Sequence, residues 1–184
     1  KIRYTYTYNS PVAFRNPIFF QGTVSEAGNL CDLGALIGGK KLNEKGKKLF
    51  GTPFSQFLKF EADIKKTWTI GGIDSQTSFV MHFYGGVMTA YGNNAMAPFS
   101  ELFYIGGAND MRGFTMRSIG PGEVHYDDRT LAYLNHNGDC KAELNLEYRP
   151  QLSGSLHGAI FLDAGNVWSL RHSIREYHKK EGLI

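Results

Sequence analysis

The sequence predicts an all-β protein, an antiparallel up-and-down transmembrane β-barrel to which this chain contributes about seven strands. Segments that alternate apolar and polar residues recur along the 184 residues, and alternation of this kind is typical of β-strands. The composition includes 10 Tyr, 13 Phe and 22 Gly, which favours strands joined by turns. Three of the links between segments are very short, which favours pairing between neighbours in a meander.

The first half of the chain is expected to form strands at 2–8, 18–27, 54–70 and 79–91. The first places an isoleucine and three tyrosines on one face, and an arginine and two threonines on the other. Segment 54–70 is long for a soluble protein, where five or six residues are usual. One of its faces is apolar and the other almost wholly charged, as in a strand between lipid and a water-filled lumen. A soluble β-sandwich also has one wet face, so that alternative stays open.

The second half is expected to form strands at 98–103, 138–150 and 156–168. Two segments interrupt the strands. Residues 28–51 read as a polar insertion with a short helix near 30–36, and their lysines indicate a solvated face. Residues 103–120 are rich in glycine, which weakens both helices and strands. Such a long loop between strands is more often functional than accidental.

Composition excludes several classes of function. The net charge is only +3, and no basic run interleaves with aromatic residues, so no nucleic-acid partner is expected. No apolar stretch is long enough for a transmembrane helix, whereas a transmembrane β-strand needs only about 9–11 residues. The two cysteines, Cys31 and Cys140, lie outside any CxxC motif. We therefore expect no metal site and no cofactor. The chain opens directly into a strand pattern, which predicts a piece of a longer protein.

Three blocks of sequence carry a resemblance: GGANDMRGF with IGPG, then GDCKAELNLEYRP, then AIFLDAGNVW. Together they resemble the BamA/TamA family of outer-membrane assembly barrels, the bacterial surface antigen family, and look most like TamA-like proteins of Bacteroidetes-type bacteria. The resemblance implies a sixteen-stranded barrel preceded by POTRA domains, of which residues 1–184 are a C-terminal part. It implies the outer membrane of a Gram-negative bacterium. The one departure is Met111, where the family often has Val or Ile.

The resemblance also implies a function and partners. The barrel would insert or translocate outer-membrane proteins without catalysing a chemical reaction. Its partners would be outer-membrane lipid, unfolded outer-membrane protein clients, and periplasmic or lipoprotein components. Residues 104–137 would be a long extracellular loop folded inward, and 28–51 an insertion on the periplasmic side. The loop motif consists of Gly106, Gly107, Met111, Arg112, Gly113 and Phe114.

A cluster of three charged residues is the candidate site. Alternation puts Glu147 and Asp163 on the polar faces of two adjacent strands. The resemblance implies that Arg112 meets carboxylates at these positions. A guanidinium bonds carboxylates through two parallel donors, a geometry that lysine does not reproduce. We call Arg112, Glu147 and Asp163 the loop lock. The alternative is a solvated loop arginine.

Other functions remain as alternatives. A passive porin or a two-partner-secretion pore would use the loop as a plug, and a soluble β-sandwich would be a binding domain. A carboxylate pair such as Glu147 and Asp163 also serves glycoside hydrolysis. No substrate cleft, nucleophile elbow, phosphate loop or histidine ligand spacing accompanies it, so we expect no enzyme. We also expect no Cys31–Cys140 disulfide, because a hydrocarbon core of about 30 Å would separate the two.

Overall fold

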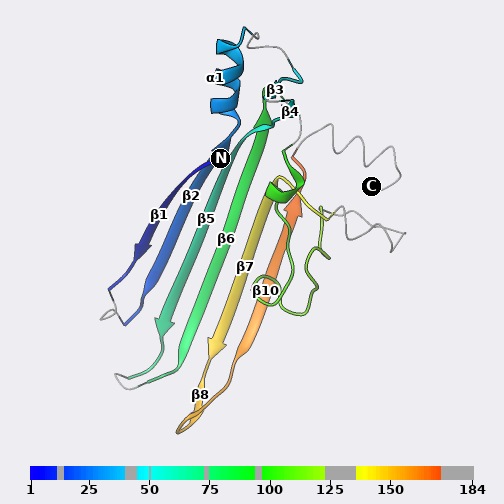
Figure 1. Ribbon diagram of the computed structural model, residues 1–184. Helices are drawn as coiled ribbons and strands as arrows, with labels where there is room; N and C mark the ends of the chain where they lie inside the picture. The colour runs from blue at the N-terminus through cyan, green and yellow to red at the C-terminus, as the bar shows by residue number, and fades with distance from the viewer. Residues whose placement is uncertain are drawn as a thin grey trace.

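The computed structural model describes residues 1–11, 15–39, 45–49, 51–72, 75–93, 97–122 and 136–170. A single sheet of six antiparallel strands, ordered β1-β2-β5-β6-β7-β10, forms the body of the protein (Figure 1). Its strands are β1 (Ile2–Asn9), β2 (Ile18–Ala27), β5 (Gln56–Thr69), β6 (Ser78–Tyr91), β7 (Cys140–Arg149) and β10 (Ile160–Trp168). Spatial order follows chain order, so the sheet is an up-and-down meander. The predicted fold class, part of an antiparallel β-barrel, is confirmed.

The remaining elements are short. A helix, α1 (Asn29–Ile37), and a hairpin of β3 (Lys48–Leu49) and β4 (Thr52–Pro53) connect β2 to β5. A 3-10 turn, η1 (Phe99–Glu101), follows β6, and a hairpin of β8 (Gln151–Ser153) and β9 (Leu156–His157) lies between β7 and β10. Among the described residues, no helix has the length and apolar character needed to cross a membrane.

The two faces of the sheet differ in polarity because every strand alternates in the predicted register. The outer face is apolar, and many of its side chains are exposed, Tyr4 by 69% and Ile160 by 70%. Within the described part of the chain no second sheet layer covers this face, whereas a β-sandwich requires one. An apolar face left open in this way is suited to lipid. Its exposed large side chains include Ile2, Tyr4, Tyr6, Tyr8, Val24, Phe60, Trp68, Val87, Leu144, Tyr148, Ile160 and Leu162.

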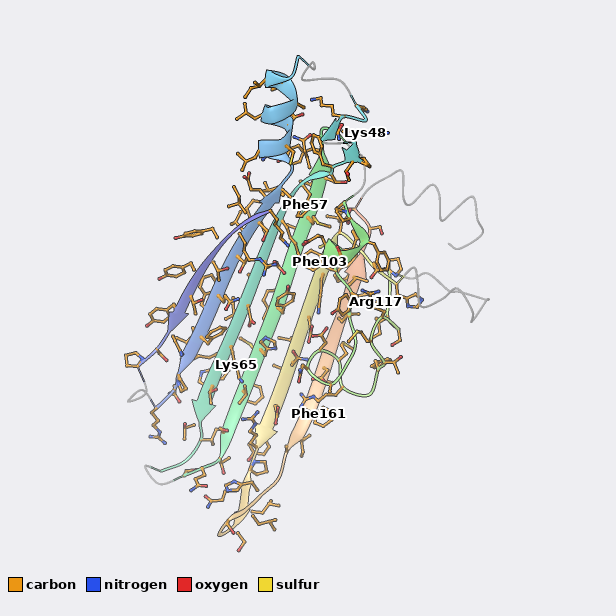
Figure 2. All side chains as sticks on the ribbon, viewed as in Figure 1. Lys48, Phe57, Lys65, Phe103, Arg117 and Phe161 are labelled. Atoms are coloured by element: carbon orange, nitrogen blue, oxygen red, sulfur yellow. The ribbon has the colours of Figure 1, made fainter. Side chains whose placement is uncertain are left out.

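The inner face is polar, and the loop after β6 packs against it. The buried cluster between loop and sheet comprises Phe57, Met88, Phe103, Ile105, Met111 and Val167 (Figure 2 labels Phe57 and Phe103). Two glycines on the sheet make room for it. A Cβ added to Gly165 would lie 2.5 Å from Ile105 Cδ1, and one added to Gly86 would overlap the ring of Phe103. The loop therefore rests where the sheet has no side chains.

The predicted strand at 98–103 is wrong. Residues after Pro98 form η1, and only Phe103 makes an isolated bridge, to Gly138. Pro98 has no N–H to donate to a ladder, and the side chain of Phe103 turns into the buried cluster instead. β6 therefore leads directly into the loop and pairs with β7. The sheet has six strands rather than about seven.

The absence of a strand at 98–103 also changes the expected position of segment 28–51. The described residues of segment 28–51 lie at the end of the sheet where β6 ends and β7 begins, and the loop leaves the sheet at this end, which we call the loop end (Figure 1). The expected placement of the two at opposite ends is wrong, because it counted a strand that does not form. Cys31 and Cys140 also share this end, and both are free thiols. β5 and β6 lie between β2 and β7, a width of roughly 14 Å across the sheet, so the membrane thickness does not separate the cysteines.

Candidate functional site

The described part of the loop, residues 104–122, folds back on itself before it meets the sheet. Gly107 N donates to Phe114 O (3.0 Å), and Arg117 N donates to Ile105 O (3.0 Å). The turn that these bonds close carries Met111 and Arg112 at its tip. Gly106 has a φ of +110°, and a Cβ there would collide with Thr115 O, so this position requires glycine. Of the predicted loop 104–137, residues 123–135 lie outside the described residues.

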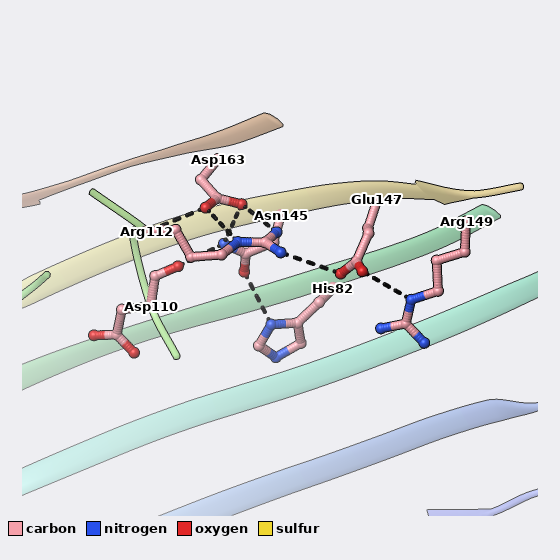
Figure 3. Close-up of polar contacts among 7 residues, drawn as sticks. All are labelled: His82, Asp110, Arg112, Asn145, Glu147, Arg149 and Asp163. Carbon is pink, nitrogen blue, oxygen red and sulfur yellow. Dashed lines mark hydrogen bonds and ion pairs between the residues drawn. The ribbon is translucent and has the colours of Figure 1, made fainter. Parts of the chain in front are cut away.

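Arg112 reaches β7 and β10 from the tip (Figure 3). Its Nε donates to Asp163 Oδ2 (2.9 Å) and its Nη2 to Asp163 Oδ1 (2.8 Å), a two-pronged contact. Its backbone N also donates to Asp163 Oδ2 (3.1 Å). The remaining prong, Nη1, donates to Glu147 Oε2 (3.2 Å). The structure thus brings together all three residues of the loop lock.

Burial and charge favour this contact. The side chain of Asp163 is 5% exposed, that of Glu147 19% and that of Arg112 28%. The hydrogen bonds that Arg112 donates to the Asp163 carboxylate raise the pKa of Arg112 above its ordinary value, so the guanidinium stays charged. The ring of Phe161 lies 3.8 Å from Arg112 Cζ, and an aromatic face attracts a cation at that distance. Two carboxylates and one ring therefore surround the guanidinium.

A second set of contacts holds the tip beside the lock. Lys141 Nζ binds Asp110 Oδ2 (2.8 Å) and also Glu143 Oε2 (3.1 Å). Asn145 Nδ2 donates to the backbone oxygen of Asp110 (2.7 Å) and to Asp163 Oδ1 (3.2 Å). Asn145 therefore contacts both the loop and the carboxylate that receives Arg112. The sequence places Asn145 on the same face as Glu147, but nothing in the pattern indicates where Asp110 lies.

The polar network continues across the inner face. His82 on β6 contacts Asn145 Oδ1 through Nδ1 (3.0 Å) and Asp63 Oδ1 on β5 through Nε2 (2.9 Å). Arg149 Nε donates to Glu147 Oε1 (2.8 Å), with a side chain that is 47% exposed. Contacts of this kind link the loop lock, whose carboxylates lie on β7 and β10, to β6 and β5.

The loop motif divides into buried and open positions. Met111 is buried in the cluster under the tip. Gly107 and Gly113 have positive φ, and a Cβ added to either would have no neighbour within 4 Å, so their role is backbone conformation alone. Phe114 is 52% exposed. The motif thus combines one apolar anchor, one charged anchor and glycines that permit the turn.

Two open cavities of about 410 and 430 Å³, each lined in part by charged side chains, flank the loop on the inner face. Charged side chains from the sheet and Asp110 line both, which suits water better than an apolar ligand. In the described ranges, no group of three or more His, Cys, Asp or Glu residues is arranged to hold a metal ion. Glu147 and Asp163 accept bonds from one guanidinium, an arrangement that favours a structural role over acid–base catalysis.

A single meander with an open apolar face, a polar inner face and an inward loop defines a segment of an outer-membrane β-barrel. The Omp85 superfamily domain matches residues 41–183, well over half of the chain, and the chain belongs to this superfamily. It is 28% identical over 123 residues to the outer membrane protein assembly factor BamA of Neisseria meningitidis serogroup B. That match covers 63% of this chain and 15% of the relative.

These comparisons confirm the resemblance to the BamA/TamA type and the location in the outer membrane of a Gram-negative bacterium. The chain spans only a small part of the length of the relative that it matches. The finer likeness to Bacteroidetes proteins stays a prediction.

Proposed function

We propose that this chain is part of a barrel that inserts other proteins into the outer membrane, or translocates them, without hydrolysing any bond. Membership of the Omp85 superfamily and similarity to a protein named as an outer-membrane assembly factor support the proposal. The partners are membrane lipid, unfolded outer-membrane protein clients, and periplasmic or lipoprotein components. Clients would pair with a sheet edge by β-augmentation, in which main-chain hydrogen bonds supply the affinity.

The loop lock is the observation that gives the proposal its mechanism. Four hydrogen bonds from Arg112 hold the loop tip against β7 and β10. A tip fixed there stiffens the wall on the inner side while leaving the outer face to lipid. In our proposal this stiffness keeps the wall in shape while a client pairs elsewhere on the barrel.

We further propose that the loop end of the sheet is the extracellular end. The described residues of segment 28–51 lie at the same end, so the segment would also be extracellular, in place of the periplasmic position expected from the sequence. Labelling of single cysteines in intact cells tests this orientation. Reagents that cannot cross the outer membrane should modify Lys45→Cys, and labelling only after the membrane is permeabilised would refute it.

Replacing Arg112 separates the assembly function from a passive pore. In the full-length protein, Arg112→Ala should slow the insertion of client barrels into proteoliposomes, while single-channel conductance changes little. Arg149→Ala is the matched control, because Arg149 shares the partner Glu147 but is largely exposed. Heat-modifiable mobility on gels reports whether each variant is folded.

The opposite pattern would favour a porin or a two-partner-secretion pore. In such a pore the loop is a plug, so its release would raise conductance. Unchanged client insertion by a folded Arg112→Ala protein would contradict the proposed role of the loop lock.

A further inference from the structure

Helix α1 carries a stripe of exposed apolar side chains that packing within the described structure does not use. Leu30, Leu33 and Ile37 are 66%, 55% and 83% exposed. Their spacing places all three on one side of the helix. The other side is anchored, since Ala35 is buried and Asp32 forms an ion pair with Lys47, whose side chain is 1% exposed. The helix is thus fixed on one side and open on the other.

The start of α1 lies over the outer face of the sheet. Asn29 Nδ2 donates to Glu26 Oε2 (2.7 Å), and Asn29 Oδ1 accepts bonds from Tyr91 OH (2.8 Å) and Gln56 Nε2 (3.3 Å). By register, Glu26, Gln56 and Tyr91 all belong to the outer face, on three adjacent strands. Gln56 is buried, although it points to the side that otherwise meets lipid. The first residue of α1 therefore caps the lipid-facing surface at the loop end.

Aromatic residues indicate the depth at which α1 begins. Tyr91 pairs with Gln56 on β5, and Trp68 lies twelve residues further along that strand, where it packs on Phe79. Twelve residues span roughly 40 Å along a strand, which the usual tilt of about 35–45° reduces to roughly 30 Å. That is about the thickness of the hydrocarbon core. Aromatic residues gather at both boundaries of barrels, so Tyr91 and Asn29 lie at one of them.

We propose that α1 is a membrane-surface anchor, with Leu30, Leu33 and Ile37 seated in lipid at the boundary of the leaflet on the loop end. Two observations select lipid as the occupant. The helix starts on the lipid-facing side of the sheet, and it starts at the boundary level. Lys45 and Lys48 are exposed in the segment that Lys47 ties to α1 (Figure 2 labels Lys48). Cations close to a helix that lies at the membrane surface suit anionic lipid headgroups.

A fluorescence experiment on the full-length protein in bilayers tests this anchor. Single cysteines replace Leu30, Leu33 or Ile37 in a cysteine-free background and carry the environment-sensitive probe NBD. Tyr6→Cys and Thr5→Cys provide the references, since these neighbours on β1 face the outer and inner sides respectively. The bilayers contain brominated phospholipid as a quencher, and heat-modifiable mobility confirms that each protein is folded.

Probes on the stripe should show blue-shifted emission and quenching closer to position 6 than to position 5. Quenching should weaken from position 30 to position 37, because the helix leads away from the sheet (Figure 1). Emission and quenching like those at position 5 would overturn the proposal. Blue-shifted emission without quenching by lipid would also overturn it, because a protein surface would then cover the stripe.

Discussion

Replacement of Arg112 by alanine should release the loop tip from the sheet. The variant loses three side-chain hydrogen bonds, two to Asp163 and one to Glu147. Hydrogen bonds to charged groups contribute about 1.5–3 kcal/mol each in favourable cases, and loss of one partner from a fully buried ion pair costs about 3–5 kcal/mol. Arg112 and Glu147 are only partly buried, so these figures are upper limits for this site.

Two features of the structure reduce the cost. Asp163 keeps the bond from the backbone N of residue 112 and the bond from Asn145 Nδ2. Water also reaches the space beside Glu147, whose side chain is 19% exposed. We therefore expect a loss of about 2–3 kcal/mol in the free energy of loop opening, below the value for a fully buried pair. This corresponds to a rise of roughly 30- to 150-fold in the open population.

Hydrogen exchange on the full-length protein measures this population directly. The relevant amides are Gly107 N and Arg117 N, which close the turn that carries Arg112, and their exchange tracks local opening. Arg149→Ala should raise exchange less than about fivefold, because an exposed pair contributes less than about 1 kcal/mol. Equal exchange in the Arg112→Ala and Arg149→Ala proteins would refute the reasoning.

Three further predictions test the loop lock and the contacts around it. Asp163→Asn should raise loop exchange more than Glu147→Gln, because Asp163 receives three of the four bonds from Arg112; equal effects would contradict the assigned geometry. Gly165→Ala should cost about 1–3 kcal/mol in unfolding free energy, since the new Cβ meets Ile105 Cδ1 at 2.5 Å. Gly22→Ala is the control and should cost less, since its Cβ would meet only ordinary contacts of 3.4 Å or more. Lys141→Met should cost about 3–5 kcal/mol in urea unfolding, because it leaves the nearly buried Glu143 without its cation; an unchanged midpoint would argue against that pair.

The strands were predictable because alternation survives in every one of them. β5 shows why, since its register with β2 and β6 keeps Lys59, Glu61, Asp63 and Lys65 on the inner face, and Lys66 is its one charged residue on the outer face. The prediction from alternation failed at 98–103. Phe103 is apolar as a strand residue would be, but it makes only an isolated bridge, to Gly138, and belongs to no strand. Its ring fills the space over Gly86, and a contact between distant residues of this kind leaves no periodic signal. Because the strand predicted at 98–103 was counted, segment 28–51 was expected at the end of the sheet opposite the loop.

The site was predictable in part. Glu147 and Asp163 followed from alternation, and their pairing with Arg112 came from a family resemblance rather than from the pattern itself. Asp110 and Lys141 were missed, because their contact depends on how the glycine turn aims the loop backbone. Asn145 shares the face of Glu147, so its position was visible, but its two bonds were not.

The central claim is that Arg112 and Asp163 act as one unit that holds the loop on the sheet. A double-mutant cycle of Arg112→Ala and Asp163→Ala, read by exchange at Gly107 N and Arg117 N, tests it most directly. Residues in one ion-pair network are coupled by about 0.5–3 kcal/mol, and we expect a value in the upper half of this range. The double variant should then open scarcely more often than either single variant. Additive effects of the two substitutions would contradict the claim.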